Sequence, residues 1–329
     1  MIITRTPFRI SFVGGGSDLG AYYRKQRGAV LSTTIDKYMY ISSHTFFEHD
    51  KVRIKYSKTE THQSVDDIEH PIVKEVLKKF DVKGGLEISS IADVPAGTGL
   101  GSSSSYTVGL LHNMYTKFNK FVTKEHLADE ACTIEIEKLG EPIGKQDQYA
   151  AAYGGLNVIA FNPNESVDVE AIHLKRSTCD ALEGNLMMFY TGMQRKTASI
   201  LTEQRTNMGS EEKFRTLGTM VDLVWDLRDA LYANDLTSFG DLLHKNWLLK
   251  KQLASKISNP ELNSMYDRAR GAGALGGKIL GAGGGGFLLV YCEEEHQENV
   301  RKALSPMRSF DFGFDREGSK LIYVGDEYE

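Results

Sequence analysis

The stretch Pro95–Tyr106, PAGTGLGSSSSY, most constrains what this chain can fold into. It follows a β-rich run, Leu86–Ile91, and precedes apolar positions at helical spacing over Ser102–Phe118, which predicts a strand, a glycine loop and a helix. Such a loop has a bare main chain, and the first amides of a helix are unpaired and partly positive. The loop therefore predicts an anion site, in which a serine caps the helix or ligates Mg²⁺. An ordinary capped turn is the alternative.

The loop departs from two common nucleotide-binding patterns. The phosphate loop G-x-x-x-x-G-K-[ST] needs a lysine, and no lysine follows Gly101. The dinucleotide fingerprint G-x-G-x-x-G is also broken, because the spacing in this chain is G-x-G-x-G. A dehydrogenase that uses the loop for a dinucleotide is therefore disfavoured.

Composition narrows the class of protein. The chain has 329 residues, of which 41% are hydrophobic, enough for one large core or two ordinary ones. A formal net charge of −5 argues against a basic surface for nucleic acid. Three widely spaced cysteines offer no disulfide framework or zinc spacing and indicate a reducing compartment. No secretory leader and no apolar run of about 20 residues is found, so we expect a cytoplasmic protein without a membrane span.

Strand-like and helix-like runs mix without strict alternation, which predicts an α+β fold in two lobes. The first lobe, residues 1–182, opens with strands over Ile2–Val13 and Val30–Ser42. The second lobe, residues 183–329, contains long helices near residues 194–206, 211–233 and 237–256. The boundary is expected near residues 180–185.

Two acids are candidates for chemistry. In the helix expected over Lys124–Leu139, Glu135 points into the apolar stripe, where a carboxylate is costly unless it is paired or holds a metal. A buried salt bridge is the alternative for Glu135, and Glu137 is expected to face water. Asp147 falls in the first turn of a short helix after a glycine break, where the helix dipole favours an ionised acid. A simple capping role is its alternative.

A third glycine cluster, GAGGGG at Gly281–Gly286, is entropically costly without a use. Close packing of the main chain between a helix and a strand is its plainest explanation.

Three stretches together resemble the motifs of the GHMP small-molecule kinases, which include galactokinase, homoserine kinase and mevalonate kinase. PFRISFVGGGSD at residues 7–18 resembles the first motif, PAGTGLGSSSS the second, nucleotide-binding motif, and KILGAGGGGF at residues 278–287 the third. They occur in the family's order, so the resemblance covers essentially the whole chain. It implies a two-lobe α+β fold, with a ribosomal S5 domain 2-like N-terminal lobe and a ferredoxin-like C-terminal lobe around a substrate cleft.

The resemblance implies ATP and Mg²⁺ as cofactors, with the second motif around the triphosphate. The implied ATP-binding residues are Pro95, Ala96, Gly97, Thr98, Gly99, Leu100, Gly101, Ser102, Ser103 and Ser104. By position, Ser103 and Glu135 match the family's magnesium ligands. Asp147 matches the acid beside the accepting hydroxyl, and Arg9 stands where relatives carry a Lys or Arg near that acid.

One departure bears on the substrate. Galactokinases carry Glu-His where this chain has Gly15 and Gly16, and that glutamate meets the hydroxymethyl end of the sugar. The loss disfavours galactose and leaves room for a longer, anionic C6 end. FRISFVGGGSDL, IGKQDQYAAAYGG and FYTGMQRKTASIL are most similar to kinases that phosphorylate the anomeric hydroxyl of D-glycero-D-manno-heptose 7-phosphate; the kinase part of fucokinases is a close cousin.

The implied partner is thus a small-molecule sugar phosphate, and Asp18 matches an aspartate that binds sugar hydroxyls. The implied substrate-binding residues are Gly15, Gly16, Ser17, Asp18, Tyr190, Thr191, Gly192, Arg195, Gly283, Gly284 and Gly285. Candidate cations for the phosphate are Arg24, Lys25, Arg195 and Lys196, with a solvated surface charge as the alternative for each. A kinase for L-fucose or galactose and a non-catalytic sugar sensor are the competing functions, and the sequence leaves the oligomeric state open.

Overall fold

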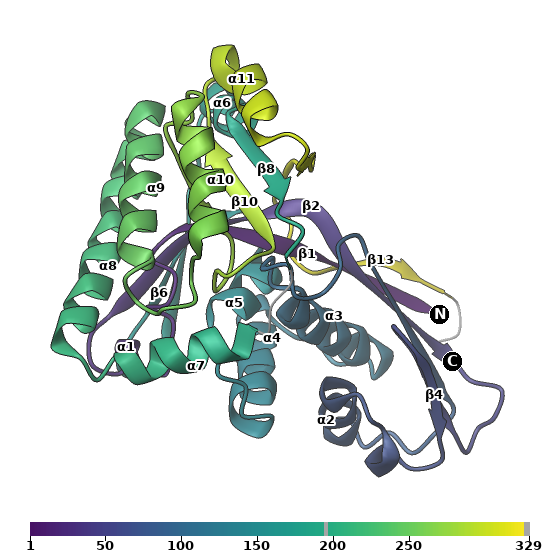
Figure 1. Cartoon of the computed structure of the whole chain (residues 1–329). Helices are drawn as coiled ribbons and strands as arrows, with labels where there is room; N and C mark the ends of the chain where they lie inside the picture. The colour runs from purple at the N-terminus through teal and green to yellow at the C-terminus, as the bar shows by residue number, and fades with distance from the viewer. Residues whose placement is uncertain (194–196, 326–329) are drawn as a thin grey trace.

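The computed structural model describes residues 1–193 and 197–325 (Figure 1). Among these residues, nine strands form a large sheet and four strands form a smaller one. One continuous core of buried apolar side chains runs through both parts. The mixed α+β architecture predicted from the sequence is confirmed.

The large sheet is built mainly on two long antiparallel strands, β1 and β2. Its strands are β1 (Ile2–Val13), β2 (Gly28–Thr45), β3 (Val52–Lys55), β4 (Thr59–His62), β5 (Leu86–Ala92), β6 (Leu156–Phe161), β7 (Val167–Ala171), β12 (Phe314–Asp315) and β13 (Lys320–Val324). The main order is β13-β1-β2-β5-β3-β4, while β6 and β12 also pair with β2, and β7 pairs with β6. The β1–β2 register shifts between Pro7 and Phe8 and again after Ser11, so Arg9, which pairs with Thr34, lies in the strand between two irregularities.

The helices of the first half of the chain are α1 (Gly20–Tyr23), η1 (Val65–Asp67), α2 (Pro71–Lys79), α3 (Ser102–Lys117), α4 (Lys124–Cys132), η2 (Thr133–Lys138), α5 (Gln146–Tyr153) and α6 (Arg176–Gly184). Among these helices, α3 and α5 pack directly against this sheet. The single helix expected over Lys124–Leu139 is α4 followed by the π-helical segment η2, a local widening that is frequent at functional sites. The region in which a lobe boundary was expected coincides with the end of α6.

The second half supplies the small sheet and its helices. The elements are β8 (Leu186–Tyr190), α7 (Thr197–Asn207), α8 (Glu211–Tyr232), α9 (Leu236–Lys250), α10 (Pro260–Gly271), β9 (Gly276–Ile279), β10 (Phe287–Tyr291), α11 (Glu294–Leu304) and β11 (Arg308–Ser309). The sheet order is β11-β8-β10-β9. α8 and α9 pack on each other, and both also contact β1 (Figure 1). None of the described helices has the length and apolar character needed to cross a membrane.

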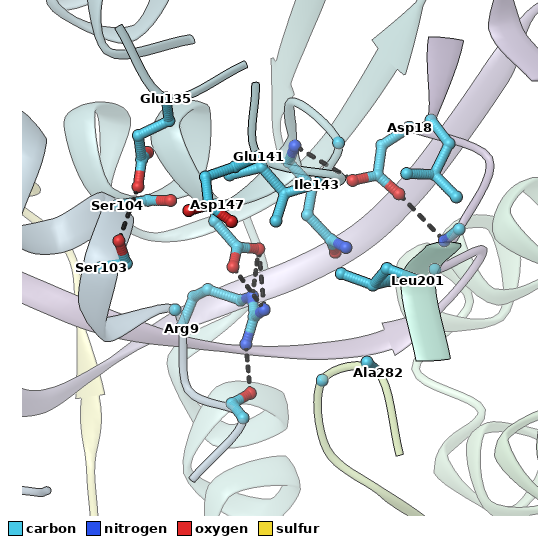
Figure 2. A pocket seen from close by; sticks show the side chains of 18 of the residues that line it. Arg9, Asp18, Ser103, Ser104, Glu135, Glu141, Ile143, Asp147, Leu201 and Ala282 are labelled. Atoms are coloured by element: carbon cyan, nitrogen blue, oxygen red, sulfur yellow. Dashed lines mark hydrogen bonds and ion pairs between the residues drawn. The ribbon is translucent and has the colours of Figure 1, made fainter. Parts of the chain in front are cut away.

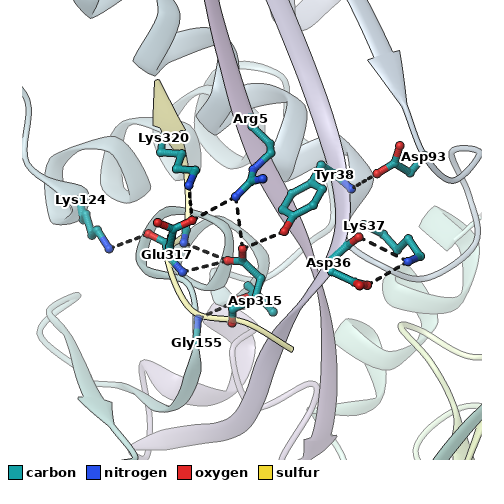
Figure 3. A network of polar contacts seen from close by, with 12 residues as sticks. Arg5, Asp36, Lys37, Tyr38, Asp93, Lys124, Gly155, Asp315, Glu317 and Lys320 are labelled. Atoms are coloured by element: carbon teal, nitrogen blue, oxygen red, sulfur yellow. Dashed lines mark hydrogen bonds and ion pairs between the residues drawn. The ribbon is translucent and has the colours of Figure 1, made fainter. Parts of the chain in front are cut away.

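The end of the chain returns to the large sheet, where β13 pairs with β1 and β12 with β2. Figure 3 shows the polar contacts that fix this return. Asp315 accepts a hydrogen bond from the Tyr38 hydroxyl at 3.0 Å, and Lys124 Nζ donates to the Glu317 carbonyl at 2.9 Å. A cut between residues 182 and 183 therefore assigns to the second lobe two strands that lie in the sheet of the first.

Candidate active site

A cavity of about 280 Å³ lies where the loop before α3, the end of β1 and the start of α7 come together (Figure 2). It collects twelve residues that the sequence singled out. Six come from the second glycine motif: Gly97, Gly99, Gly101, Ser102, Ser103 and Ser104. The other six are Arg9, Gly15, Gly16, Asp18, Glu135 and Asp147. Segments that are far apart in the sequence thus meet around one space.

The loop before α3 has the form predicted from its glycines. Gly101 is the N-cap of α3 and has a φ of 77°, which glycine adopts without strain. Pro95, Ala96, Thr98 and Leu100 do not line the cavity. Thr98 is buried and its hydroxyl donates to the Pro95 carbonyl at 3.0 Å, so it shapes the loop.

Arg9 and Asp147 form a two-pronged ion pair in the cavity wall (Figure 2). Nε of Arg9 lies 2.8 Å from Oδ1 of Asp147, and Nη2 lies 2.7 Å from Oδ2. The remaining prong of the guanidinium, Nη1, donates to the Gly99 carbonyl at 2.6 Å, and the Arg9 amide donates to the Leu100 carbonyl at 3.0 Å. The guanidinium is 5% exposed and the carboxylate 23%, so Asp147 is the partner that faces the cavity. Arg9 therefore ties the acid to the glycine loop.

Glu135 projects from η2 toward the first turn of α3. The Ser103 hydroxyl donates to its Oε1 at 2.7 Å, and Gln148 Nε2 donates to its Oε2 at 2.8 Å. No cation among the described residues pairs with it, so the buried salt bridge that was the alternative for Glu135 is not found there. Burial raises the pKa of Glu135 to about 7, against the lowering effect of the hydrogen bonds from Ser103 and Gln148. Glu137 is exposed, as expected.

The chemistry of this corner suits Mg²⁺. A hydroxyl and a carboxylate side by side are hard oxygen ligands, and Oε1 of Gln148 is a further buried oxygen without a hydrogen-bond partner in the described chain. The described residues hold no group of three or more His, Cys, Asp or Glu able to bind a metal. An ion beside Ser103 and Glu135 therefore needs further ligands, such as phosphate oxygens and water.

Asp18 lies on the opposite wall and is buried. It accepts hydrogen bonds from the Gly16 amide at 2.9 Å and the Gln146 amide at 3.4 Å. Burial and, secondarily, the charge of Asp147 raise the pKa of Asp18 above its ordinary value.

The third glycine cluster packs against the second. Gly281 and Ala282 line the cavity, whereas Gly283, Gly284 and Gly285 do not. A Cβ added at Gly99 would lie 2.6 Å from the Leu280 carbonyl oxygen, and one added at Gly281 would lie 2.7 Å from Gly99 Cα. The two loops therefore meet main chain to main chain; this is close packing of the backbone, but between two loops rather than between the helix and strand considered from the sequence.

Several residues expected at the substrate lie elsewhere. Ser17 is buried, and its hydroxyl donates to the Ala29 carbonyl at 2.9 Å. Tyr190, Thr191 and Gly192 are outside the cavity lining; the Thr191 hydroxyl donates to the Gly286 carbonyl at 2.9 Å and supports the third glycine loop.

Of the four cations considered for the phosphate, the structure describes Arg24 and Lys25, neither of which lines this cavity. Arg24 pairs with Glu165 at 2.6 Å, and Lys25 lies over the Phe214 ring at 5.7 Å. Arg195 and Lys196 fall outside the described residues.

Lys250 is the main residue of the cavity that sequence reasoning missed. It is 4% exposed, and its Nζ donates to the Gly15 carbonyl at 2.8 Å. A signal was present in the sequence, because Leu243, Asn246, Trp247 and Lys250 recur at helical spacing on the buried face of α9. Glu141, Ile143, Gln146, Ala198 and Leu201 also line the cavity but carry no comparable pattern.

Comparison with known proteins agrees with this architecture. The model of the GHMP kinases N terminal domain matches residues 69–155, and that of the GHMP kinases C terminal domain matches residues 227–307. The chain is 30% identical to the D-glycero-α-D-manno-heptose 7-phosphate kinase of Campylobacter jejuni, over 97% of this chain and 98% of that protein. It is 25% identical to the galactokinase of Pyrococcus furiosus, over 92% of each.

Solved structures show the same fold over almost the whole chain. A D-glycero-D-manno-heptose 1-phosphate kinase from Bacteroides thetaiotaomicron has 25% identity and a TM-score of 0.81, covering 99% of this chain and 100% of that one. A putative sugar kinase from Campylobacter jejuni has 29% identity and a TM-score of 0.77, covering 97% of each. The fold and the cavity define a small-molecule phosphotransferase. The chain belongs to the GHMP kinase family and is an ATP-dependent sugar kinase.

Proposed function

We propose that this kinase transfers the γ-phosphoryl group of ATP to the anomeric hydroxyl of D-glycero-D-manno-heptose 7-phosphate, giving the 1,7-bisphosphate. The observation that carries the proposal is the Asp147 carboxylate, held by Arg9 at the end of the glycine loop and open to the same cavity as Ser103 and Glu135. The full-length relative in Campylobacter jejuni supports the choice of acceptor.

The loop before α3 would bind the triphosphate. Amides at the start of α3 and in the loop offer donors in a wall with little side-chain bulk, and the helix dipole adds positive potential. Ser103 and Glu135 would hold Mg²⁺, which neutralises charge on the transferring phosphates when bound. Binding a cation there favours the ionised form of Glu135, whose pKa burial has raised.

Asp147 would orient the anomeric hydroxyl and accept its proton as the hydroxyl oxygen bonds to the γ-phosphorus and the bond from that phosphorus to the β–γ bridging oxygen breaks. The two prongs of Arg9 fix the carboxylate plane, so the lone pairs offered to the hydroxyl keep one direction. Asp18, on the far wall, would accept hydrogen bonds from ring hydroxyls. In this proposal the boundary at residues 182 and 183 separates the nucleotide-binding part from the part that completes the acceptor side.

A panel of acceptors tests the proposal. Heptose 7-phosphate, the unphosphorylated heptose, L-fucose, galactose and mevalonate are each incubated with ATP and Mg²⁺, and ADP release is measured. Phosphorus NMR of the product then shows whether the new phosphate is on C1. A higher kcat/KM for fucose or galactose, or a product phosphorylated elsewhere, contradicts the proposal, and no turnover with any acceptor indicates a sensor.

A further inference from the structure

Lys250 is a buried cation without an acid in direct contact. Its Nζ donates to the Gly15 carbonyl at 2.8 Å and to Oε1 of Gln204 at 3.1 Å, and no ion pair joins it to a carboxylate in the described chain. An ammonium has three protons, so one donor remains for the cavity that Lys250 lines. Burying a charge in this way is unfavourable unless something else in the site balances it.

Gln204, from the same face of α7 as the cavity-lining Leu201, adds a second free donor. Its side chain is fully buried, and its Oε1 accepts from Lys250, which fixes the orientation of the amide. Nε2 of Gln204 then has no hydrogen-bond partner among the described residues. A buried donor of this kind indicates an acceptor that the protein itself does not supply.

Both donors lie against Gly16; Lys250 is part of the cavity lining, whereas Gln204 is fully buried beside it. A Cβ added at Gly16 would lie 2.0 Å from Nε2 of Gln204 and 3.2 Å from Nζ of Lys250. The absence of a side chain at residue 16 is therefore what lets these two groups approach the cavity wall. The charges of both Asp147 and Lys250 act on Asp18, so this acid is within electrostatic reach of both groups.

The main chain around this end is rigidly held, which keeps the two donors in place. Lys278 Nζ donates to the Ser11 and Phe12 carbonyls at 2.7 and 3.2 Å, and the Gly14 amide donates to Oδ1 of Asn246 at 3.1 Å. Lys278 is buried and has the cations Lys250 and Arg9 as its charged neighbours, whereas the charged neighbour of Lys250 is the acid Asp18. The segment from Ser11 to Gly16 is thus contacted by two buried lysines, Lys250 and Lys278, and by one carboxylate, that of Asp18.

We propose that Lys250 and Gln204 form an oxyanion subsite that binds the phosphoryl group already present on the acceptor. The inference rests on the proposed function, because it places the reacting hydroxyl at Asp147 and the substrate's own phosphate at the other end of the cavity. In this arrangement Lys250 supplies the charge and its third N–H bond, and the amide of Gln204 supplies the second donor.

An adjoining hollow of about 200 Å³ is the competing place for the phosphate. Arg24, Lys145 and Arg205 line it. Arg24 and Lys145 both contact Glu165, at 2.6 and 2.8 Å, so much of their charge is already neutralised. Arg205 is exposed and provides a matched cation on α7 that lies outside the proposed subsite.

The test compares phosphorylated and unphosphorylated acceptors in four proteins: wild type, Lys250→Met, Gln204→Leu and Arg205→Gln. For Lys250→Met we expect KM for heptose 7-phosphate to rise about 10- to 100-fold, the range typical of a lost hydrogen bond to a charged group, with little change for the unphosphorylated heptose. In Gln204→Leu the KM for heptose 7-phosphate should also rise, by a smaller factor, with little change for the unphosphorylated heptose. Arg205→Gln should have the KM values of wild type for both acceptors.

An equal rise in KM for both acceptors in Lys250→Met would overturn the proposed subsite. Lys250 would then only hold the main chain at Gly15 in place. A rise in KM for heptose 7-phosphate alone in Arg205→Gln would place the substrate's phosphate in the adjoining hollow, and this result would also overturn the proposed subsite. Nucleotide binding by calorimetry and the thermal unfolding midpoint verify folding, and Lys250→Arg, which keeps the charge, replaces Lys250→Met if that variant does not fold. Failure of the proposed function is distinct, because wild type would then show no preference for heptose 7-phosphate in the acceptor panel.

Discussion

The Arg9 guanidinium donates hydrogen bonds to both carboxylate oxygens of Asp147 and, through its remaining nitrogen, Nη1, to the Gly99 carbonyl. One side chain therefore sets the position of the acid relative to the loop that would carry the triphosphate. Arginine can do this because its planar fork matches a carboxylate and still has a donor to spare.

Replacing the acid tests the chemistry directly. For Asp147→Asn we expect turnover to fall by several orders of magnitude while ATP still binds, because the amide cannot accept the proton and the loop stays in place. Stopped-flow turnover and calorimetric ATP binding measure the two effects. Asp168→Asn, which loses an exposed ion pair with Arg27, should behave as wild type. Near-wild-type turnover in Asp147→Asn would remove this residue from the reaction.

Replacing the guanidinium group of Arg9 by an ammonium group tests the positioning role of this residue. Arg9→Lys keeps the charge but cannot contact both oxygens of Asp147 and the Gly99 carbonyl at once. We expect kcat to fall about 10- to 100-fold, as for loss of a charge-assisted hydrogen bond, with a smaller change in the KM for ATP. An unchanged kcat would show that the orientation of Asp147 does not limit the reaction.

The proposed Mg²⁺ site at Ser103 and Glu135 can be tested by removing the charge of the carboxylate. In Glu135→Gln we expect the Mg²⁺ concentration needed for half-maximal rate to rise at least about tenfold, because the hydroxyl of Ser103 alone is a weak ligand. A titration of the initial rate with MgCl₂ at saturating ATP measures it. Glu137→Gln, exposed and two residues further along η2, is the matched control. If both variants need the same Mg²⁺ concentration as wild type, Glu135 is not a ligand.

The pH dependence of kcat/KM for heptose 7-phosphate should reflect the titration of Lys250. Burial lowers the pKa of Lys250 to about 8, while the nearby charge of Asp18 acts in the opposite direction. Above that pH the free enzyme loses the cation, whereas a phosphate monoester with a second pKa near 6 stays dianionic. We therefore expect kcat/KM for heptose 7-phosphate to fall above about pH 8 in wild type and to lose this descending limb in Lys250→Met.

Stability should change in the opposite direction over the same range. Between the pKa of about 8 in the folded protein and the ordinary value of 10.5, the unfolded chain binds more protons at Lys250 than the folded chain does. The contribution of Lys250 to the free energy of unfolding therefore rises with pH from about 8 to 10.5. Urea unfolding of wild type and Lys250→Met at several pH values measures this difference, and parallel curves for the two proteins would contradict it.

The contact between the glycine loops predicts a sharp difference between two glycines. Gly281→Ala would place a methyl group 2.7 Å from Gly99 Cα at a φ of 69°, so we expect a loss of about 2–4 kcal/mol of stability. Gly271→Ala, at the end of α10 with nothing within 4 Å of the added carbon, should be within about 0.5 kcal/mol of wild type. Denaturant unfolding of the two variants measures the difference, and equal stabilities would show that the loops separate easily.

Local patterns in the sequence predicted the elements that frame the cavity. The strand, glycine loop and helix around residues 86–117 follow from composition and apolar spacing, and the inward direction of Glu135 follows from its place on an apolar stripe. The resemblance to a family, rather than periodicity, supplied the grouping of Arg9 with Asp147. Their contact joins residues 138 apart in sequence, which no local rule encodes.

What the sequence could not supply depends on tertiary packing. The π-helical form of residues 133–138 replaces an ordinary helix by a small shift in hydrogen bonding that side-chain periodicity does not reveal. The return of β12 and β13 to the large sheet depends on pairing with β2 and β1, at the opposite end of the chain. Lys250 was not among the predicted site residues, because a lysine at a buried helical position is rare.

The close contact between Gly99 and Gly281 also affects how this chain could be combined with part of another in a chimera. The two loops come from opposite halves of the chain, and each fits only because the other lacks a side chain. A chimera that joins the front of this chain to the back of a relative needs glycine at the position of Gly281, or the new junction would collide with the main chain at Gly99. For this chain, exchange of the second half therefore depends on a few atoms of main chain as well as on the residues that touch substrate.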